Sequence, residues 1–320
     1  MLLGISVYKS RTVKTDEDFM VAGRGVPVYM LVATLVCTWI GSGSLFGTAG
    51  LTFRTGISEL WFSAGAWVGI LVVYMIAARV RRIAQYTLTD LLEKRYSQLA
   101  KVLGTITIIV AYMVIAGYQF KGGGRFIAIL SDGSITPETG MIIAAILIVG
   151  FTVLAGMVSI VTIDIFNGSI MLLAMIVTLP FAIAGHGGID AVLTTIRETE
   201  PSHLSVMGGH DFVWVVGIAL PTFLLLMSES SMYQKFSSAD NEANARKAVM
   251  GMFIGVVVIE TLMMLIALVG FAIYADDPRF FMADGSVTRA MAEEIILRIG
   301  FEQLPTIIGS VLLAAGAASS

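Results

Sequence analysis

Charged side chains are scarce in this sequence. Only 13% of its 320 residues are Asp, Glu, Lys or Arg, whereas 57% are hydrophobic and the mean hydropathy is +0.87. Soluble domains carry about 25% charged residues, so this chain has too little charge to cover a water-facing surface. The apolar content excludes a disordered chain. A formal net charge of −3 offers no basic face, so no nucleic-acid partner is expected.

Reactive side chains are also few. Cys37 is the single cysteine and has no disulfide partner in the chain. His186, His203 and His210 fall in one loop at irregular spacing, which does not suit a zinc site. Catalysis needs at least two matched groups, and no nucleophile–base pair is visible, so the sequence does not predict an enzyme.

Long apolar stretches are what the sequence does contain. A bilayer core about 30 Å thick needs roughly 20 apolar residues per helix, because backbone groups there must bond to one another. We therefore expect an all-α polytopic membrane protein, a single transmembrane domain over 1–320. The predicted spans are 27–50, 57–78, 101–120, 139–157, 159–184, 211–230 and 247–275, with an eighth beginning at Pro305, while residues 1–8 are too short to cross.

The basic residues predict an orientation. If residues 9–26 are cytoplasmic, the inside segments hold 13 of the 20 Lys and Arg residues, as the positive-inside rule requires. That count places Lys235 in a cytoplasmic loop. The expected location is the cell membrane, inner or plasma, crossed several times.

The first full span contains an unusual cluster of small and polar residues, CTWIGSGSLFG at 37–47. One interpretation is a broken helix whose free carbonyl groups bind a cation and whose ends face a solute. The other is close helix packing, since Gly43 and Gly47 form a small-xxx-small pair. The residues alone favour neither.

Two acids lie inside predicted spans, where an ionised carboxylate is costly. Asp164 begins the fifth span, and an ion path is favoured over an aspartate that simply reaches interfacial water. Glu260 lies in the seventh span with no obvious partner, so structural pairing and function remain equally open.

Three further segments stand out. Tyr118 and Gln119 end the third span before KGGGR at 121–125, which fits an interfacial anchor with a flexible exit, although the amide has hydrogen bonds to satisfy. Residues 287–299 have helical apolar spacing and predict a short lid helix over the seventh and eighth spans. Ser319 and Ser320 could supply two oxygens to Na⁺ or bond to their own helix.

Several motifs resemble the sodium:solute symporter family, and they occur in that family's order along the chain. Jointly they are specific, although none is sufficient alone. They are DFMVAGRGVP at 18–27, ATLVCTWIGSGS at 33–44, TLTDLLEKRY at 87–96, GMVSIVTID at 156–164, YQKFSSA at 233–239 and NARKA at 244–248.

The resemblance implies a LeuT-type bundle of two inverted five-helix repeats. Residues 27–184 would form the first repeat, residues 211–320 the first three helices of the second, and residues 1–8 the remnant of an N-terminal helix. The bundle is thus expected to be partial, with both ends of the chain cut within helices.

The resemblance also implies site residues. Carbonyl groups at Cys37 and Ile40, with the hydroxyls of Ser319 and Ser320, would bind sodium as the coupling ion, and no other metal or cofactor is expected. Asp164 matches an aspartate on the ion's path. The solute would contact Trp39, Tyr118 and Gln119, and an indole at position 39 favours an apolar or cationic face over a sugar.

The resemblance therefore implies a Na⁺-coupled symporter of a small organic solute that works by alternating access in the lipid bilayer. Two alternatives remain open: a transporter-like sensory input module of a signalling protein, and a truncated symporter without activity.

Overall fold

A computed structural model describes residues 15, 21–83, 87–282 and 286–319. The described part is helical, which confirms the all-α prediction. The elements are η1 (Ala22–Arg24), α3 (Val28–Trp39), α4 (Ser42–Thr55), η2 (Gly56–Glu59), α5 (Leu60–Ile83), α6 (Leu88–Arg95), α7 (Gln98–Leu130), α8 (Pro137–Gly185), α9 (Ile189–Thr199), η3 (Pro201–Leu204), α10 (Phe212–Ser228), α11 (Ser230–Ser237), α12 (Glu242–Ile273), α13 (Arg289–Glu293), α14 (Ile295–Arg298), η4 (Ile299–Gln303) and α15 (Thr306–Ser319).

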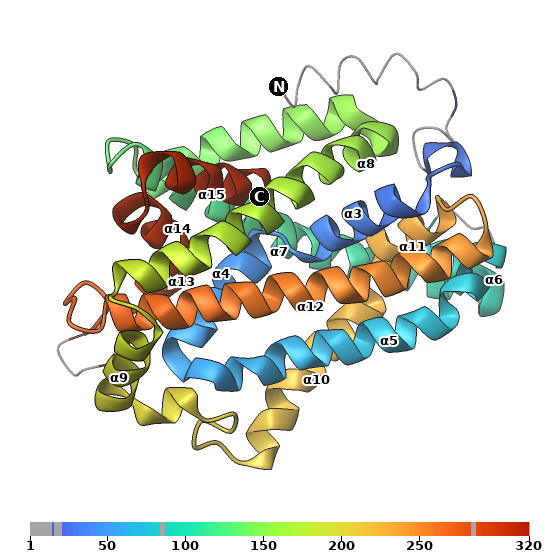
Figure 1. The fold of residues 1–320 in the computed structure, drawn as a ribbon. Coiled ribbons are helices and arrows are strands. Elements are labelled where there is room, and N and C mark those ends of the chain that lie inside the picture. Colours follow the sequence, from blue (N-terminus) through green and yellow to red (C-terminus); the bar gives the residue numbers. More distant parts are fainter. Residues whose placement is uncertain (1–14, 16–20, 84–86, 283–285, 320) are drawn as a thin grey trace.

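Helix α12 lies at the centre of the bundle. It packs against α5, α3, α4 and α8, and these long helices run side by side in Figure 1. Apolar residues surround its second half, where Met263, Ile266 and Ala267 are all fully buried. A helix that is apolar on every side is buried on every side, so α12 forms the core against which the other helices pack.

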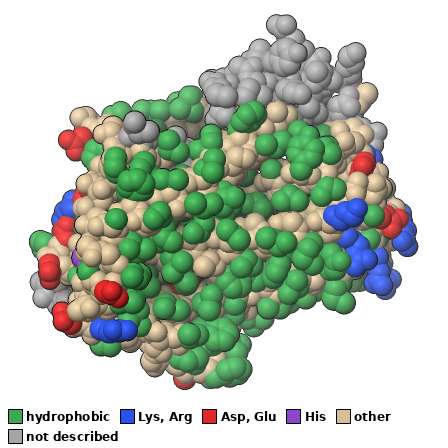
Figure 2. All heavy atoms as spheres, viewed as in Figure 1, with side chains coloured by type: hydrophobic (Ala, Val, Ile, Leu, Met, Phe, Trp, Pro, Cys, Tyr) green, Lys and Arg blue, Asp and Glu red, His purple; other side chains and the backbone are tan. Residues whose placement is uncertain are grey.

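Several helices have the length and composition of membrane spans. Among the described residues, five helical stretches are long and apolar enough to cross a bilayer: Gly43–Ile83, Gln98–Leu130, Ile160–Gly185, Phe212–Ser237 and Glu242–Ile273. Figure 2 shows hydrophobic side chains over the middle of one face, with Lys and Arg gathered at one end and mixed charges at the other. This banding fits a helical membrane protein.

The third span is longer than the sequence suggested. Helix α7 continues to Leu130, so the expected flexible exit at 122–124 is wrong. These three glycines are buried, and a Cβ at Gly124 would lie 2.6 Å from the nitrogen of Met141 and the carbonyl oxygen of Pro137. Because glycine has no side chain, α8 can approach α7 closely here, and this packing keeps residues 122–124 helical.

The fourth and fifth predicted spans belong to one continuous helix, α8, assigned over Pro137–Gly185. Figure 1 shows α8 as two arms that run in opposite directions. The sequence placed a boundary at residue 158, whereas the backbone stays helical there. The second arm, Ile160–Gly185, carries Asp164.

The segment TLTDLLEKRY forms a capped helix beside α7. The Thr87 hydroxyl and the Asp90 carboxylate form a capping box at the start of α6. Lys101 of α7 then pairs with Asp90 at 3.1 Å and Glu93 at 2.6 Å. A capping box satisfies the free N–H groups of a helix start, so this motif sets where α6 begins and ties it to α7.

Close contact between α5 and α10 depends on a second glycine. A Cβ at Gly65 would lie 2.1 Å from the carbonyl oxygen of Ala219 and 2.8 Å from Oγ1 of Thr222. Gly65→Ala is therefore expected to destabilise the protein by about 1–3 kcal/mol, because the helices must separate. Chemical denaturation in detergent measures this, with Gly217→Ala on α10 as the control. No described atom lies within 4 Å of a Cβ at Gly217, so a comparable loss there would contradict the packing argument.

Candidate functional site

The first full span is broken between α3 and α4. Helix α3 ends at Trp39, and Ile40 (φ −87°, ψ 78°) and Gly41 (φ −103°, ψ −171°) leave the helical conformation before α4 begins at Ser42. A break of this kind leaves the last carbonyl groups of α3 without the N–H groups of a continuing helix. The predicted break in the helix is therefore present.

The alternative of close packing at Gly43 and Gly47 has less support. No described atom lies within 4 Å of a Cβ built at Gly47, and at Gly43 the nearest atom is Cδ1 of Tyr118 at 3.8 Å. Neither glycine is needed for a close helix contact. The ring of Tyr118, on α7, instead lies beside the first turn of α4, next to the break.

Asp164 reaches the break from α8. Its carboxylate accepts a hydrogen bond from the hydroxyl of Thr34, which is fully buried on α3. The thiol of Cys37 donates to the backbone carbonyl of Asp164 at 3.2 Å. The Asp164 side chain is 14% exposed, so it points into the protein and does not reach interfacial water.

Lys235 is not the loop residue that the sequence indicated. It lies on α11, which follows a second break at Glu229 (φ −66°, ψ 98°) and packs against α3. Its Nζ is 3.8 Å from Oδ2 of Asp164 and donates to the carbonyl of Thr34 at 2.9 Å. The ammonium group also donates to the hydroxyl oxygen of Thr38. A lysine is buried only where partners compensate its charge, and the sequence order could not reveal these.

Glu260 also has partners that the sequence did not indicate. The indole N–H of Trp39 donates to Oε1 at 2.8 Å, and that of Trp67 donates to Oε2 at 2.6 Å. Glu260 is 2% exposed. The carboxylate therefore fixes the indole of Trp39 immediately before the break.

Three predicted site residues remain to be placed: Gln119, Ser319 and Ser320. Gln119 is half-buried on α7, one residue beyond Tyr118. Helix α15 packs against α8 and reaches α4 and α7, and it includes Ser319. The side chain of Ser319 and all of Ser320 lie outside the described residues. Within the described residues there is no cluster of three or more His, Cys, Asp or Glu side chains that could hold another metal.

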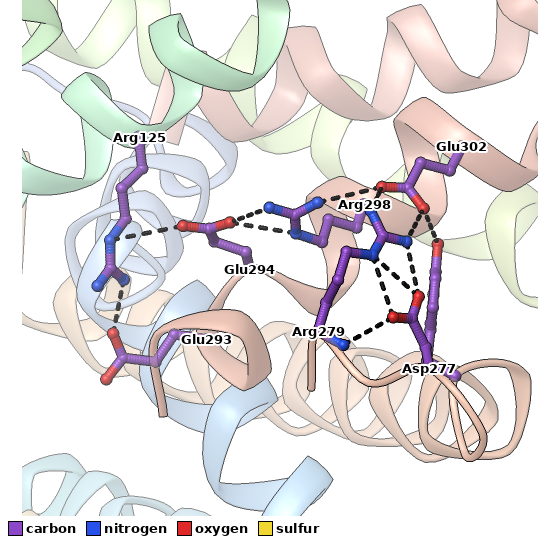
Figure 3. A network of polar contacts seen from close by, with 8 residues as sticks. Arg125, Asp277, Arg279, Glu293, Glu294, Arg298 and Glu302 are labelled. Atoms are coloured by element: carbon purple, nitrogen blue, oxygen red, sulfur yellow. Dashed lines mark hydrogen bonds and ion pairs between the residues drawn. The ribbon is translucent and has the colours of Figure 1, made fainter. Parts of the chain in front are cut away.

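A chain of ion pairs closes the opposite end of the bundle from α6 and α11 (Figures 1 and 3). The expected helix at 287–299 is present as two short helices, α13 and α14, which pack mainly on α4 of the first span and not over the seventh and eighth spans. With η4 they form what we call the lid, residues 289–303. Arg125 of α7 pairs with Glu293 at 2.6 Å and Glu294 at 3.8 Å. From Glu294 the pairs continue through Arg298, Glu302, Arg279 and Asp277.

The lid rests on the first broken span. Helix α13 packs on α4, and a Cβ at Gly50 would lie 2.8 Å from Cγ of Glu293. Burial alone would raise the pKa of Glu293, but hydrogen bonds from Arg125 and Arg289 outweigh it and hold that pKa below its usual range. The carboxylate therefore stays ionised at neutral pH and keeps the lid bound to α7. Arg125 is a lid contact, not merely an interfacial anchor.

Comparison with known proteins identifies this arrangement. The model of the sodium:solute symporter family matches residues 19–319. The chain belongs to this family. Its members are transporters, and Na⁺ is their coupling ion.

Curated relatives of the chain include two bacterial symporters. The sodium/pantothenate symporter of Escherichia coli is 26% identical over 280 residues, covering 82% of this chain and 56% of that protein. Sodium/proline symporter 2 of Staphylococcus saprophyticus is 23% identical over 227 residues, covering 68% and 44%. The chain therefore spans about half the length of the curated relatives it matches.

A solved structure establishes the fold. The substrate-bound, outward-open Na⁺-coupled sialic acid symporter superposes with a TM-score of 0.84 at 15% identity, covering 99% of this chain and 66% of that one. The chain thus has the LeuT-type fold of this symporter family member, which confirms the predicted fold class.

Proposed function

We propose that this chain is the core of a Na⁺-coupled symporter that moves a small organic solute by alternating access. The observation that carries the proposal is the break at Ile40–Gly41, which ends α3 about one turn beyond Cys37, whose thiol donates to the backbone carbonyl of Asp164. Broken helices of this kind bind coupling ions and solutes at the middle of the membrane. Membership of the symporter family supports the same activity.

For the ion site we propose carbonyl groups of Cys37 and Ile40 together with the hydroxyls of Ser319 and Ser320. Helix α15, which includes Ser319, packs against α8, the element that carries Asp164. Asp164 would receive the ion on its way to the cytoplasm, where it would share this carboxylate with the ammonium of Lys235. Hard oxygen donors of these kinds suit an alkali-metal ion.

For the solute we propose contacts with Trp39, Tyr118 and Gln119. Trp39 is the last residue of α3 before the break, and the ring of Tyr118 lies beside Gly43 just after it, which supports this position. An indole and a phenol ring offer flat apolar faces that attract a cationic or apolar group. We therefore favour a small organic solute with such a face over a sugar.

Two broken helices support the proposed repeat organisation. The break at Ile40–Gly41 lies in the first helix of the segment 27–184, and the break at Glu229 lies in the first helix of the segment 211–320. Inverted repeats in transporters characteristically place such discontinuous helices in corresponding positions. Positive side chains gather at the α6–α11 end (Figure 2), which supports our placing residues 9–26 on the cytoplasmic side of the cell membrane.

The ion gradient supplies the energy in this scheme. A tenfold Na⁺ ratio contributes about 1.4 kcal/mol, and a potential of about 100 mV adds about 2.3 kcal/mol per charge. One Na⁺ could thus sustain roughly 500-fold accumulation of a neutral solute.

Uptake by the full-length protein in liposomes tests the function. We expect accumulation of a labelled solute, chosen from amino acids, carboxylates, vitamins and quaternary amines, only when an inward Na⁺ gradient is present. Replacing Na⁺ by K⁺ or choline should abolish it. Uptake that proceeds equally in K⁺ would contradict Na⁺ coupling.

The ion site has its own variants within this assay. Ser319→Ala and Ser320→Ala should each raise the Na⁺ concentration for half-maximal uptake about tenfold, because each removes one ligand worth about 1.4 kcal/mol. Ser310→Ala, nine residues earlier on α15 and exposed, is the control. An unchanged Na⁺ dependence would remove that serine from the site.

A further inference from the structure

A second buried carboxylate lies beside Glu260. Glu59, the last residue of η2, is 1% exposed and accepts a hydrogen bond from the hydroxyl of Ser63 at 2.9 Å. One turn further along α5 from Ser63, the indole N–H of Trp67 donates to Oε2 of Glu260 at 2.6 Å. Two acids, one from α12 and one from the start of the α5 span, therefore lie along the same face of α5, and Trp39 links Glu260 to the end of α3.

The hydrogen-bond partners of the two acids differ. Both oxygens of Glu260 accept indole N–H groups, from Trp39 and Trp67, so this carboxyl group is arranged to carry a negative charge. Glu59 has the Ser63 hydroxyl on Oε1, whereas Oε2 is buried with no hydrogen-bond partner in the described part of the protein. Only one of the two sites is therefore built for an anion.

Few hydrogen-bond donors are available to Glu59. A serine hydroxyl carries one hydrogen, which here goes to Glu59. If both acids were ionised, two like charges would face each other in a dry interior with only one hydroxyl between them. When two carboxylates share a site in this way, one of them holds a proton.

We propose that Glu59 and Glu260 form a proton-binding pair, in which Glu59 carries one exchangeable proton and Glu260 is the ionised partner. The proton comes from water and returns to it, and no other group is consumed. The pair is a cation site separate from the one proposed for Na⁺. It does not depend on the chain being a symporter.

Neighbouring elements leave few other charges near Glu59. From α4, Arg54 donates to the carbonyl of Gly50 on its own helix. From η3, His203 stacks on Phe271, and its backbone would lie 2.2 Å from a Cβ at Gly56. Around Glu260, the nearest charged side chain of α8 is Asp164, which is engaged by Thr34 and Lys235. The charged side chain of α14, Arg298, is paired with Glu294 and Glu302.

Infrared spectroscopy of the full-length protein over a pH series tests the proposal, with the proton itself as the probe. The wild-type protein should show the C=O band of one buried carboxylic acid, which disappears at alkaline pH. Glu59→Gln, which keeps the shape of the side chain, should remove this band. Glu260→Gln should keep the band and move its pH midpoint, because the like charge is gone.

The control is Glu242→Gln, an exposed carboxylate at the start of α12 that pairs with Arg82. It should change neither the band nor its midpoint. A wild-type protein with no such band, or a Glu59→Gln protein that keeps it, would overturn the proposal. If Glu59→Gln does not fold, the wild-type band and the midpoint of Glu260→Gln decide the matter. No Na⁺ or solute is needed, so the result is independent of the transport assay.

Discussion

Replacing Asp164 by alanine is expected to lower the free energy of unfolding by about 3–5 kcal/mol. The substitution leaves the ammonium of Lys235, 8% exposed, without its carboxylate. Removing one partner of a buried pair is costly because the other charge stays in a place where water cannot reach it. Denaturation of the purified protein in detergent measures the loss.

A second substitution separates the charge from the packing. Asp164→Ala combined with Lys235→Met should recover most of the lost stability, since a buried ion pair and an apolar replacement of similar volume are nearly equivalent. A double variant as unstable as the sum of the two single variants would mean that the pair contributes through shape alone. The wild-type protein, the two single variants and the double variant form a double-mutant cycle. Its interaction energy measures how much the Asp164–Lys235 pair contributes to stability.

Arg125→Ala is expected to destabilise the protein by about 2–3 kcal/mol and to loosen the lid. Its guanidinium is 12% exposed and holds Glu293, which is 8% exposed. Hydrogen bonds to charged groups contribute about 1.5–3 kcal/mol, and Arg289 and Arg298 keep part of the compensation. Hydrogen exchange at residues 289–303 should become faster, as mass spectrometry would detect.

The matched control is Arg82→Ala, which removes an Arg–Glu pair of nearly the same length. Arg82 lies 2.7 Å from Glu242, against 2.6 Å for Arg125 and Glu293, but these side chains are 70% and 40% exposed. Exposed pairs contribute about 0–1 kcal/mol, so little change is expected. Equal losses in the two variants would show that burial does not decide the strength of these pairs.

Much of the architecture follows from local properties of the chain. Apolar length predicts the spans because a bilayer imposes the same requirement on every segment. The broken first helix was one of two interpretations of the residues at 37–47, and the short lid helix followed from spacing at 287–299. The flexible exit predicted at residues 122–124 was wrong. Glycine weakens an isolated helix, but here its missing side chain lets α8 pack close to α7.

The partners of the buried charges could not be read from order along the chain. Asp164 and Lys235 are 71 positions apart, and Trp39 and Glu260 are separated by 221. Sequence analysis assigned Lys235 to a loop because positive residues usually follow a span. Its burial arises from the packing of α11 against α3, which brings Lys235 to Thr34, Thr38 and Asp164.

The amino-acid sequence by itself determined that this is a helical membrane protein of the sodium:solute symporter type, since hydropathy and short motifs are properties of neighbouring residues. Tertiary structure alone decided which partners the charges have: Asp164 meets Lys235, Arg125 meets the lid, and Glu260 meets two indoles. The physical reason is that a buried charge is stable only beside its partner, and helix packing, not chain order, brings the partners together.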